Sequence, residues 1–226
     1  MRYFLIALCL LAGQALAQPS MRAQDWDILH SVAMPAHPTQ HSSGGWFFNF
    51  PQYPTENLPC ANDQACASVH YVTVPLGSLA GRRALVLTGR VETPTGNPVF
   101  HYQTEPFNTA ANGCGAPAAL RLYFQRRGDN LSGNGPYEHF RWWSNPGNVQ
   151  MARGNFRLVV ALVPSQWSNV RGHKGSLSAA TINGFRAALS QVSSAGFTGG
   201  GGCSFGHGLN IDNGTARLVV TGFRFQ

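Results

Sequence analysis

The stretch that decides the fold reads ALRLYFQRR and spans residues 119–127. Apolar side chains occupy every second position, and polar or amphipathic ones lie between them. Successive side chains of a β-strand point to opposite sides, so this alternation is typical of a strand with one buried face. The apolar set is Leu120, Leu122 and Phe124, and the opposite set is Arg121, Tyr123 and Gln125.

Similar short apolar runs lie on both sides of this stretch. Clusters of glycine, proline and asparagine separate them, notably at 94–98 and 213–214, and these clusters predict turns. Many short strands with turns between them, and few helices, are typical of antiparallel pairing. We therefore predict an all-β fold, an antiparallel β-sandwich of jelly-roll type. The further predicted strands are 45–50, 68–74, 84–91, 99–104, 138–144, 155–163 and 215–225.

One helix is predicted after residue 176, capped by Ser176 or Ser178. Its apolar residues recur at helical spacing and define one buried face. We expect this short helix to be peripheral and to cover an open end or edge of the sandwich. The predicted buried residues are Ala179, Ile182, Phe185, Leu189 and Val192.

The composition supports this architecture. The chain has 226 residues, and only 11% are charged, too few for a coiled coil or a long solvated helix. Aromatic residues make up 11%, which argues against disorder. We predict one domain over 44–226, preceded by an N-terminal extension over 18–43. This extension is expected to pack through Trp26 or Ile28, with a helical turn or two over 25–32.

The first 17 residues have the anatomy of a secretory signal peptide. Arg2 is followed by an apolar run from Phe4 to Gly13, and Ala15-Leu16-Ala17 forms a small-x-small cleavage site. The apolar run is too short to span a bilayer. We therefore expect a secreted or periplasmic protein whose mature chain begins at Gln18.

Four cysteines remain after cleavage of this segment. An even number in an exported chain implies two disulfides, with three possible connectivities. We favour Cys60–Cys66 and Cys114–Cys203, because the first pair flanks a turn-rich loop and the second closes a long one. The spacing of the cysteines does not match a structural zinc site.

The mature chain is basic. Without Arg2 it has 15 basic and 9 acidic residues, a net charge of +6, and Lys174 is its only lysine. These charges are scattered rather than gathered in a stripe or a known motif, which argues against a nucleic-acid partner.

Several local motifs occur in a recognisable order. PSQWSNVRG at 164–172 is followed by Gly184-Phe185, by FGHG at 205–208 and by NGTARL at 213–218. With the preceding strands, this order resembles the galactose-binding-like jelly rolls of secreted carbohydrate-binding modules, over residues 44–226. The resemblance implies a carbohydrate or cell-envelope glycan as partner. It also implies that a structural calcium ion is possible, with no ligands identifiable, and no other cofactor.

Sugar binding requires flat aromatic faces and planar polar side chains. Trp142 and Trp143 are adjacent in a predicted strand, so only one of them can join the polar face beside it. The alternative is that the tryptophans fill the core. The predicted ligand-binding residues are Trp46, Arg121, Tyr123, Gln125, Arg141, Trp143 and His207.

The segment GGGGCSFGHG at 199–208 has two interpretations. Its backbone N–H groups suit an anion, but it lacks the Walker pattern. We favour tight packing and close strand approach, for which glycine is suited.

Catalysis is the second functional hypothesis. A glycoside hydrolase or lyase acting through a carboxylate pair would draw on only nine acidic residues, and Glu105 with Glu138 is the best pair. No G-x-S-x-G motif occurs. A structural protein-interaction module, with an exposed apolar patch and no groove, is the third. The sequence favours a non-catalytic carbohydrate-binding protein.

Overall fold

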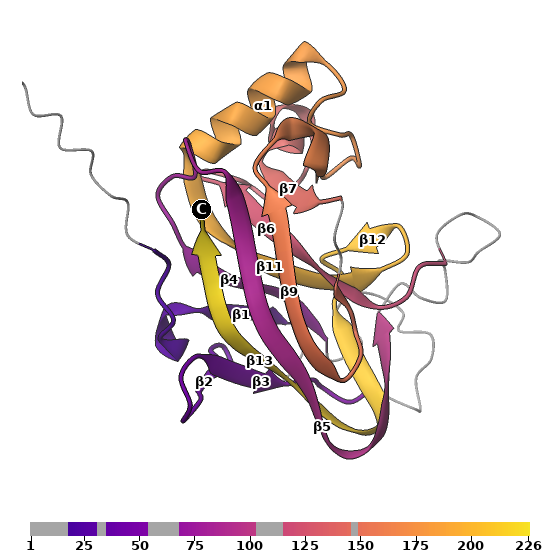
Figure 1. Cartoon of the computed structure of the whole chain (residues 1–226). Coiled ribbons are helices and arrows are strands. Elements are labelled where there is room, and N and C mark those ends of the chain that lie inside the picture. Colours follow the sequence, from indigo (N-terminus) through magenta and orange to yellow (C-terminus); the bar gives the residue numbers. More distant parts are fainter. Residues whose placement is uncertain (1–17, 31–34, 54–67, 103–114, 146–148) are drawn as a thin grey trace, which may run out of the picture.

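The chain folds almost entirely into antiparallel strands (Figure 1). The computed structural model describes residues 18–30, 35–53, 68–102, 115–145 and 149–226. Every ladder between named strands in these ranges is antiparallel, and one α-helix is present among them, α1 (Ala179–Ser190). The predicted all-β antiparallel sandwich with one short helix is therefore confirmed.

Two layers share one core. The first layer has the order β10-β7-β6-β11-β4-β1, and the second has the order β9-β5-β13-β3-β2. The layers are joined where Leu209 of β13 pairs with Val69 of β4. The strands are β1 (Asp27–His30), β2 (Thr39–Gln40), β3 (Trp46–Asn49), β4 (Val69–Pro75), β5 (Ala84–Tyr102), β6 (Ala119–Arg126), β7 (Arg141–Ser144), β8 (Val149–Gln150, beside β6), β9 (Gly154–Ala161), β10 (Trp167–Asn169), β11 (Val192–Gly201), β12 (Ser204–Phe205, beside β11) and β13 (Leu209–Phe225).

Large aromatic side chains fill the space between the layers. Trp46 of β3 stacks on Phe197 of β11, with ring centroids 6.2 Å apart and an interplanar angle of 14°. Trp26 packs against Trp46 at 4.7 Å. Aromatic burial of this kind is a major source of core stability. The alternation in 119–127 is confirmed, since Leu120, Leu122 and Phe124 are all buried.

The two longest strands, β5 and β13, pair along nearly their whole length (Figure 1). The turns predicted at 94–98 and 213–214 are wrong, because both segments lie inside these strands, opposite each other. Gly96 has φ +67° and Asn213 has φ +56°, and the register shifts between Asp212 and Gly214. A Cβ on Gly96 would lie 2.4 Å from the Asn213 carbonyl oxygen. The glycines therefore permit a bulge with close strand approach, and β5 and β13 stay paired where they bend sharply together (Figure 1).

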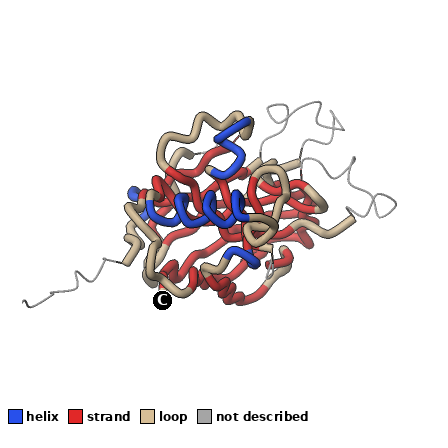
Figure 2. The backbone as a smooth tube through the Cα atoms, turned by 90° about the horizontal axis from the view of Figure 1, so that it is seen from above, coloured by secondary structure: helices blue, strands red, loops and turns tan. Residues whose placement is uncertain are grey.

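Helix α1 lies across one end of the two layers (Figures 1 and 2). Ser178, not Ser176, is its N-cap: the Thr181 amide donates to Ser178 Oγ at 3.2 Å, and the Ser178 amide donates to Thr181 Oγ1 at 2.9 Å. Phe185 is buried against Trp142, with ring centroids 5.1 Å apart. Ala179 is exposed, contrary to prediction, because it lies in the first turn, beyond the end of the core.

The N-terminal residues add strands to the sheet. Trp26 and Ile28 are buried, as expected. The predicted helical turn over 25–32 is wrong for residues 27–30, which form β1 and pair with β4. The predicted strand 138–144 begins later than expected, because residues 135–139 form the 3-10 helix η4 (Gly135–His139). The other short 3-10 helices among the described residues are η1 (Ala23–Asp25) and η5 (Pro164–Gln166).

The predicted signal peptide and three of the predicted disulfide cysteines, Cys60, Cys66 and Cys114, lie outside the described residues.

Candidate functional site

A polar groove with a volume of about 580 Å³ lies on the outer face of the first layer. Its walls come from β4, β6, β7 and β10, from the loop around Leu131 and from the segment that includes β12. Segments far apart in the sequence therefore meet here. Four predicted ligand residues line it: Arg121, Arg141, Trp143 and His207.

An aromatic row crosses three strands of this face. Tyr71 of β4 and Tyr123 of β6 have ring centroids 4.9 Å apart, and Tyr123 lies 5.2 Å from Trp143 of β7. Strand β11 lies between β4 and β6, and its residue opposite Tyr123 is Gly196. Gly196 also lets β11 and β4 approach closely, since a Cβ there would lie 2.0 Å from the Val72 carbonyl oxygen.

Arg121 is held at the groove by Phe205 of β12. Its guanidinium carbon lies 3.7 Å from the Phe205 ring centroid, a cation–π contact. Its Nε is buried and has no hydrogen-bond partner, and Arg121 forms no ion pair with any described residue. Burial lowers the pKa of the Arg121 guanidinium below its ordinary value. The side chain is a half-buried cation without a counterion among the described residues.

Arg141 has a different role, because its charge is neutralised. Its Nε lies 3.0 Å from the Asp129 carboxylate, which is fully buried, and its guanidinium donates to the Leu131 carbonyl at 2.7 Å. Gln125 donates to the same carboxylate at 2.9 Å. Arg141 and Gln125 thus hold the loop that forms one rim of the groove, where Leu131 has φ +63°.

The glycine-rich segment packs tightly beside the groove. A Cβ on Gly201 would lie 2.3 Å from the Tyr102 ring, one on Gly206 2.3 Å from the Tyr71 hydroxyl, and one on Gly208 2.4 Å from Ser68 Oγ. The packing interpretation of 199–208 is therefore confirmed. His207, between two of these glycines, is half-buried and lines the groove.

The remaining predicted site residues divide into three groups. Tyr123 and Gln125 line a smaller pocket of about 90 Å³, which shares Tyr71 and Leu131 with the groove. The prediction for Trp46 is wrong, because this side chain is 0% exposed in the core and presents no face to a ligand. Glu105 lies outside the described residues. Glu138 pairs with His139 at 2.9 Å in η4 and is not among the residues that line the groove.

Sequence reasoning missed His70, Tyr71 and Phe205. The alternation in 68–74 places Tyr71 on one face of its strand, but it does not show that β4 lies two strands from β6. Phe205 lies within the motif at 205–208, yet its contact with Arg121 depends on the hairpin between β11 and β12. These residues join the site because strands that are far apart in the sequence pair with one another.

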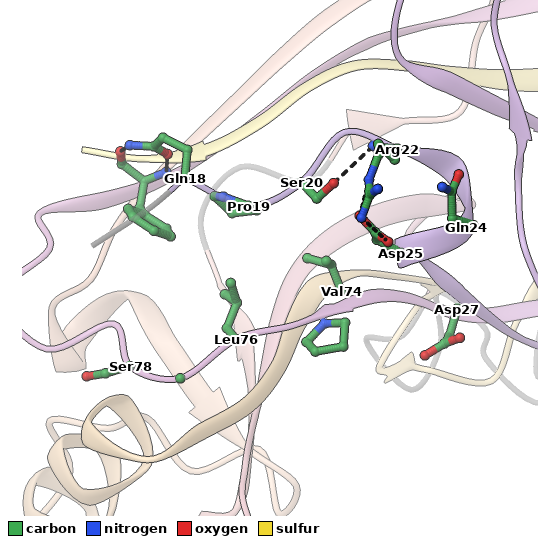
Figure 3. Close-up of a pocket in the computed structure, with 13 residues that line it drawn as sticks. Gln18, Pro19, Ser20, Arg22, Gln24, Asp25, Asp27, Val74, Leu76 and Ser78 are labelled. Atoms are coloured by element: carbon green, nitrogen blue, oxygen red, sulfur yellow. Dashed lines mark hydrogen bonds and ion pairs between the residues drawn. The ribbon is translucent and has the colours of Figure 1, made fainter. Parts of the chain in front are cut away.

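A larger hollow of about 680 Å³ lies beside the N-terminal segment (Figure 3). Several of its polar groups are engaged with protein atoms: the Gln18 side chain exchanges two 3.0 Å hydrogen bonds with the Phe225 backbone, and Arg22 pairs with Asp25 at 2.9 Å. Hydrogen bonds from Ser20 and then Arg22 lower the pKa of Asp25. We therefore take the groove, not this hollow, as the candidate site.

No described part of the chain offers a metal site, since no three His, Cys, Asp or Glu side chains cluster there. No helix within the described ranges has the length and apolar character needed to cross a membrane.

Comparisons with known proteins add a distant structural likeness. No protein-family model matches the chain, and no curated protein matches it. Among solved structures, it is similar to a xylan-binding module CBM15, with a TM-score of 0.39 and 11% sequence identity over 92% of this chain and 97% of that one. The class that the fold and the groove define is an antiparallel β-sandwich with an open, aromatic and cationic groove.

Proposed function

We propose that this chain is a secreted, non-catalytic carbohydrate-binding protein of the galactose-binding-like type, which holds a glycan of the cell envelope or its surroundings in the groove. The observation that carries the proposal is that Tyr71 and Trp143 line one open groove with Arg121, while the buried Tyr123 packs against both aromatic rings from below the groove surface. Because these residues lie on paired strands, the site is rigid before a ligand arrives, which lowers the cost of binding.

The chemistry of the lining suits a sugar. A sugar ring offers C–H faces to aromatic rings and oxygen atoms to N–H donors. Two donors of groove residues, Arg121 Nε and Trp143 Nε1, are buried and have no hydrogen-bond partner. Buried N–H groups are nearly always paired, so a bound ligand or a water is expected to complete them.

The same lining supports a binding role rather than hydrolysis. Glycoside hydrolysis through a carboxylate pair needs two Asp or Glu residues at the scissile bond. No Asp or Glu occurs among the described residues that line the groove. A protein-interaction module would instead present an exposed apolar patch, whereas this groove is lined by arginine, histidine, serine and asparagine side chains as well as by aromatic ones.

Export of the protein is part of the proposal. It rests on the signal-like residues 1–17 and on the even number of cysteines that follow them. N-terminal sequencing of the exported chain should begin at Gln18, and thiol titration without reductant should find no free thiol. Cytoplasmic retention of the whole chain, with reduced cysteines, would contradict it.

The binding proposal is tested by isothermal titration against a panel of soluble neutral and acidic polysaccharides. We expect binding to at least one of them, weakened by Trp143→Ala and by Phe205→Ala. Phe47→Ala is the matched control, because Phe47 is a half-buried aromatic on β3 of the other layer. Absence of binding across the panel, or equal loss in the control, overturns the proposal.

A further inference from the structure

We propose that the groove selects acidic glycans, in which sugar rings carry carboxylate groups, and that Arg121 is the residue that binds the carboxylate. This inference rests on the proposed function and deepens it, since it names the chemical class of the ligand. Three features of the groove support it: its charge, the geometry of Arg121, and the combination of that single cation with an aromatic surface.

The groove carries a positive charge, on Arg121, that no described residue neutralises. The carboxylate of Asp129 neutralises Arg141, at 3.0 Å. Arg121 forms no ion pair among the described residues, and no described residue of the lining is Asp or Glu. His70 and His207 add ring N–H groups to the lining and no negative charge. Arg121 thus attracts an anionic ligand, and no carboxylate of the described lining repels it.

The geometry of Arg121 suits one planar anion. Phe205 covers one face of the guanidinium at 3.7 Å and fixes its plane. The buried Nε lacks a hydrogen-bond partner. A guanidinium held in a fixed plane can donate two parallel N–H bonds to a carboxylate, which a flexible lysine cannot match. Because a partly buried charge without a partner is costly, a carboxylate placed here offsets that cost.

The surroundings of Arg121 select the rest of the ligand. In the groove lining, Tyr71 and Trp143 accompany a single guanidinium without an ion-pair partner among the described residues, not a stripe of cations. A nucleic-acid site would need many phosphate contacts along a basic track. One cation beside ring-stacking aromatics matches a sugar ring with one carboxylate, as in a polyuronate.

The test compares one polymer in two charge states. Polygalacturonate and its methyl-esterified form share the same sugar ring, but only the first carries carboxylates. We expect wild type to bind polygalacturonate about tenfold or more tightly than the ester, the range of a charge-assisted hydrogen bond. Equal affinity for both forms overturns the inference and leaves the proposed function standing, whereas binding to no glycan overturns both.

Variants then assign the preference to Arg121. Arg121→Gln should lose the preference for polygalacturonate while retaining the weaker binding of the ester. Arg157→Gln is the control, because it removes the same charge from an exposed position on β9 in the other layer. Equal weakening by both variants would mean non-specific attraction and overturn the inference. The comparison of the two polymers by wild type needs no variant, so it decides even if Arg121→Gln misfolds.

A third arm separates carboxylate from sulfate. Dextran sulfate is an anionic glycan without carboxylates, and we expect it to bind more weakly than polygalacturonate at about 0.15 M salt, where long-range attraction is screened. Tighter binding of dextran sulfate at this salt would overturn the assignment to carboxylates.

Discussion

Arg121 lies with its guanidinium carbon 3.7 Å from the ring centroid of Phe205, and this contact joins β6 to β12 at the groove. Both strands pair with β11, and they lie on its two edges, because Gly200 is opposite Ala119 of β6 and Phe205 of β12. The contact therefore depends on the hairpin that brings β12 back beside β11. It positions a cation without supplying a counter-charge, which leaves the guanidinium able to bind an anion.

Phe205→Ala should weaken ligand binding more than it weakens the fold. Phe205 is half-buried at the groove, so its loss frees the Arg121 guanidinium and removes a wall. We expect about a tenfold loss of glycan affinity, in line with a partly desolvated cation–π contact and lost positioning. Titration calorimetry measures it, with Phe47→Ala as control, since Phe47 lies 5.2 Å from Arg217 in the other layer. Unchanged affinity would show that Phe205 does not position Arg121.

Asp129→Asn should destabilise the protein strongly. The Asp129 side chain is 0% exposed and pairs with Arg141, so its neutralisation leaves a buried arginine without its counter-charge. Breaking a buried ion pair from one side costs about 3–5 kcal/mol. Urea unfolding measures the loss, and Asp27→Asn serves as control because the Asp27 side chain is 67% exposed. A loss similar to that of the control would mean that the pair does not hold the loop.

Gly206→Ala should be costly because two effects act together. Gly206 has φ +84°, and a Cβ there would lie 2.3 Å from the Tyr71 hydroxyl. Gly44→Ala isolates the backbone effect, since Gly44 has φ +90° with no atom within 4 Å of a built Cβ. We expect about 1–3 kcal/mol for Gly44→Ala from backbone strain and a larger loss for Gly206→Ala. Thermal unfolding of both variants checks the order, and the reverse order would exclude the clash.

Ser178→Ala should lower stability by about 1 kcal/mol, because it removes the capping box of α1. Ser176→Ala is the control and should change little, since Ser176 is exposed and is not the cap. Chemical unfolding of the two variants distinguishes the two cap positions that the sequence left open. Equal losses would indicate that the cap contributes nothing specific.

Acid should weaken the contact between β5 and β13 through Glu92. Burial raises the pKa of Glu92, but hydrogen bonds from Arg90 and Arg217 outweigh it, so the folded-state pKa lies below the ordinary value. The stabilisation is thus present above about pH 4.3 and is lost as the pH falls through the folded pKa. It should be under about 1 kcal/mol, because the cluster is partly exposed. The stability difference between wild type and Glu92→Gln should shrink between about pH 5 and pH 3; a constant difference would contradict it.

Local pattern was enough to predict much of this protein. The period-two alternation places Leu122 in the core and Arg121 on the outer face, because neighbouring strand residues always point to opposite sides. Phe185 and Leu189 lie on the buried face of α1 as their spacing predicts. These properties depend on residues a few positions apart, so the sequence alone determined them.

Tertiary structure alone decided the rest. The glycine and asparagine clusters at 94–98 and 213–214 have the composition of turns, yet they became facing bulges because β5 and β13 pair across more than one hundred residues. Trp46 and Trp143 are equally suited to a binding site by type, but Trp46 of the second layer faces the first layer across the core, and Trp143 faces the groove. The groove exists because β4, β6, β7 and β12 converge around small residues of β11. Such convergence depends on which strands become neighbours, and a local pattern does not encode it.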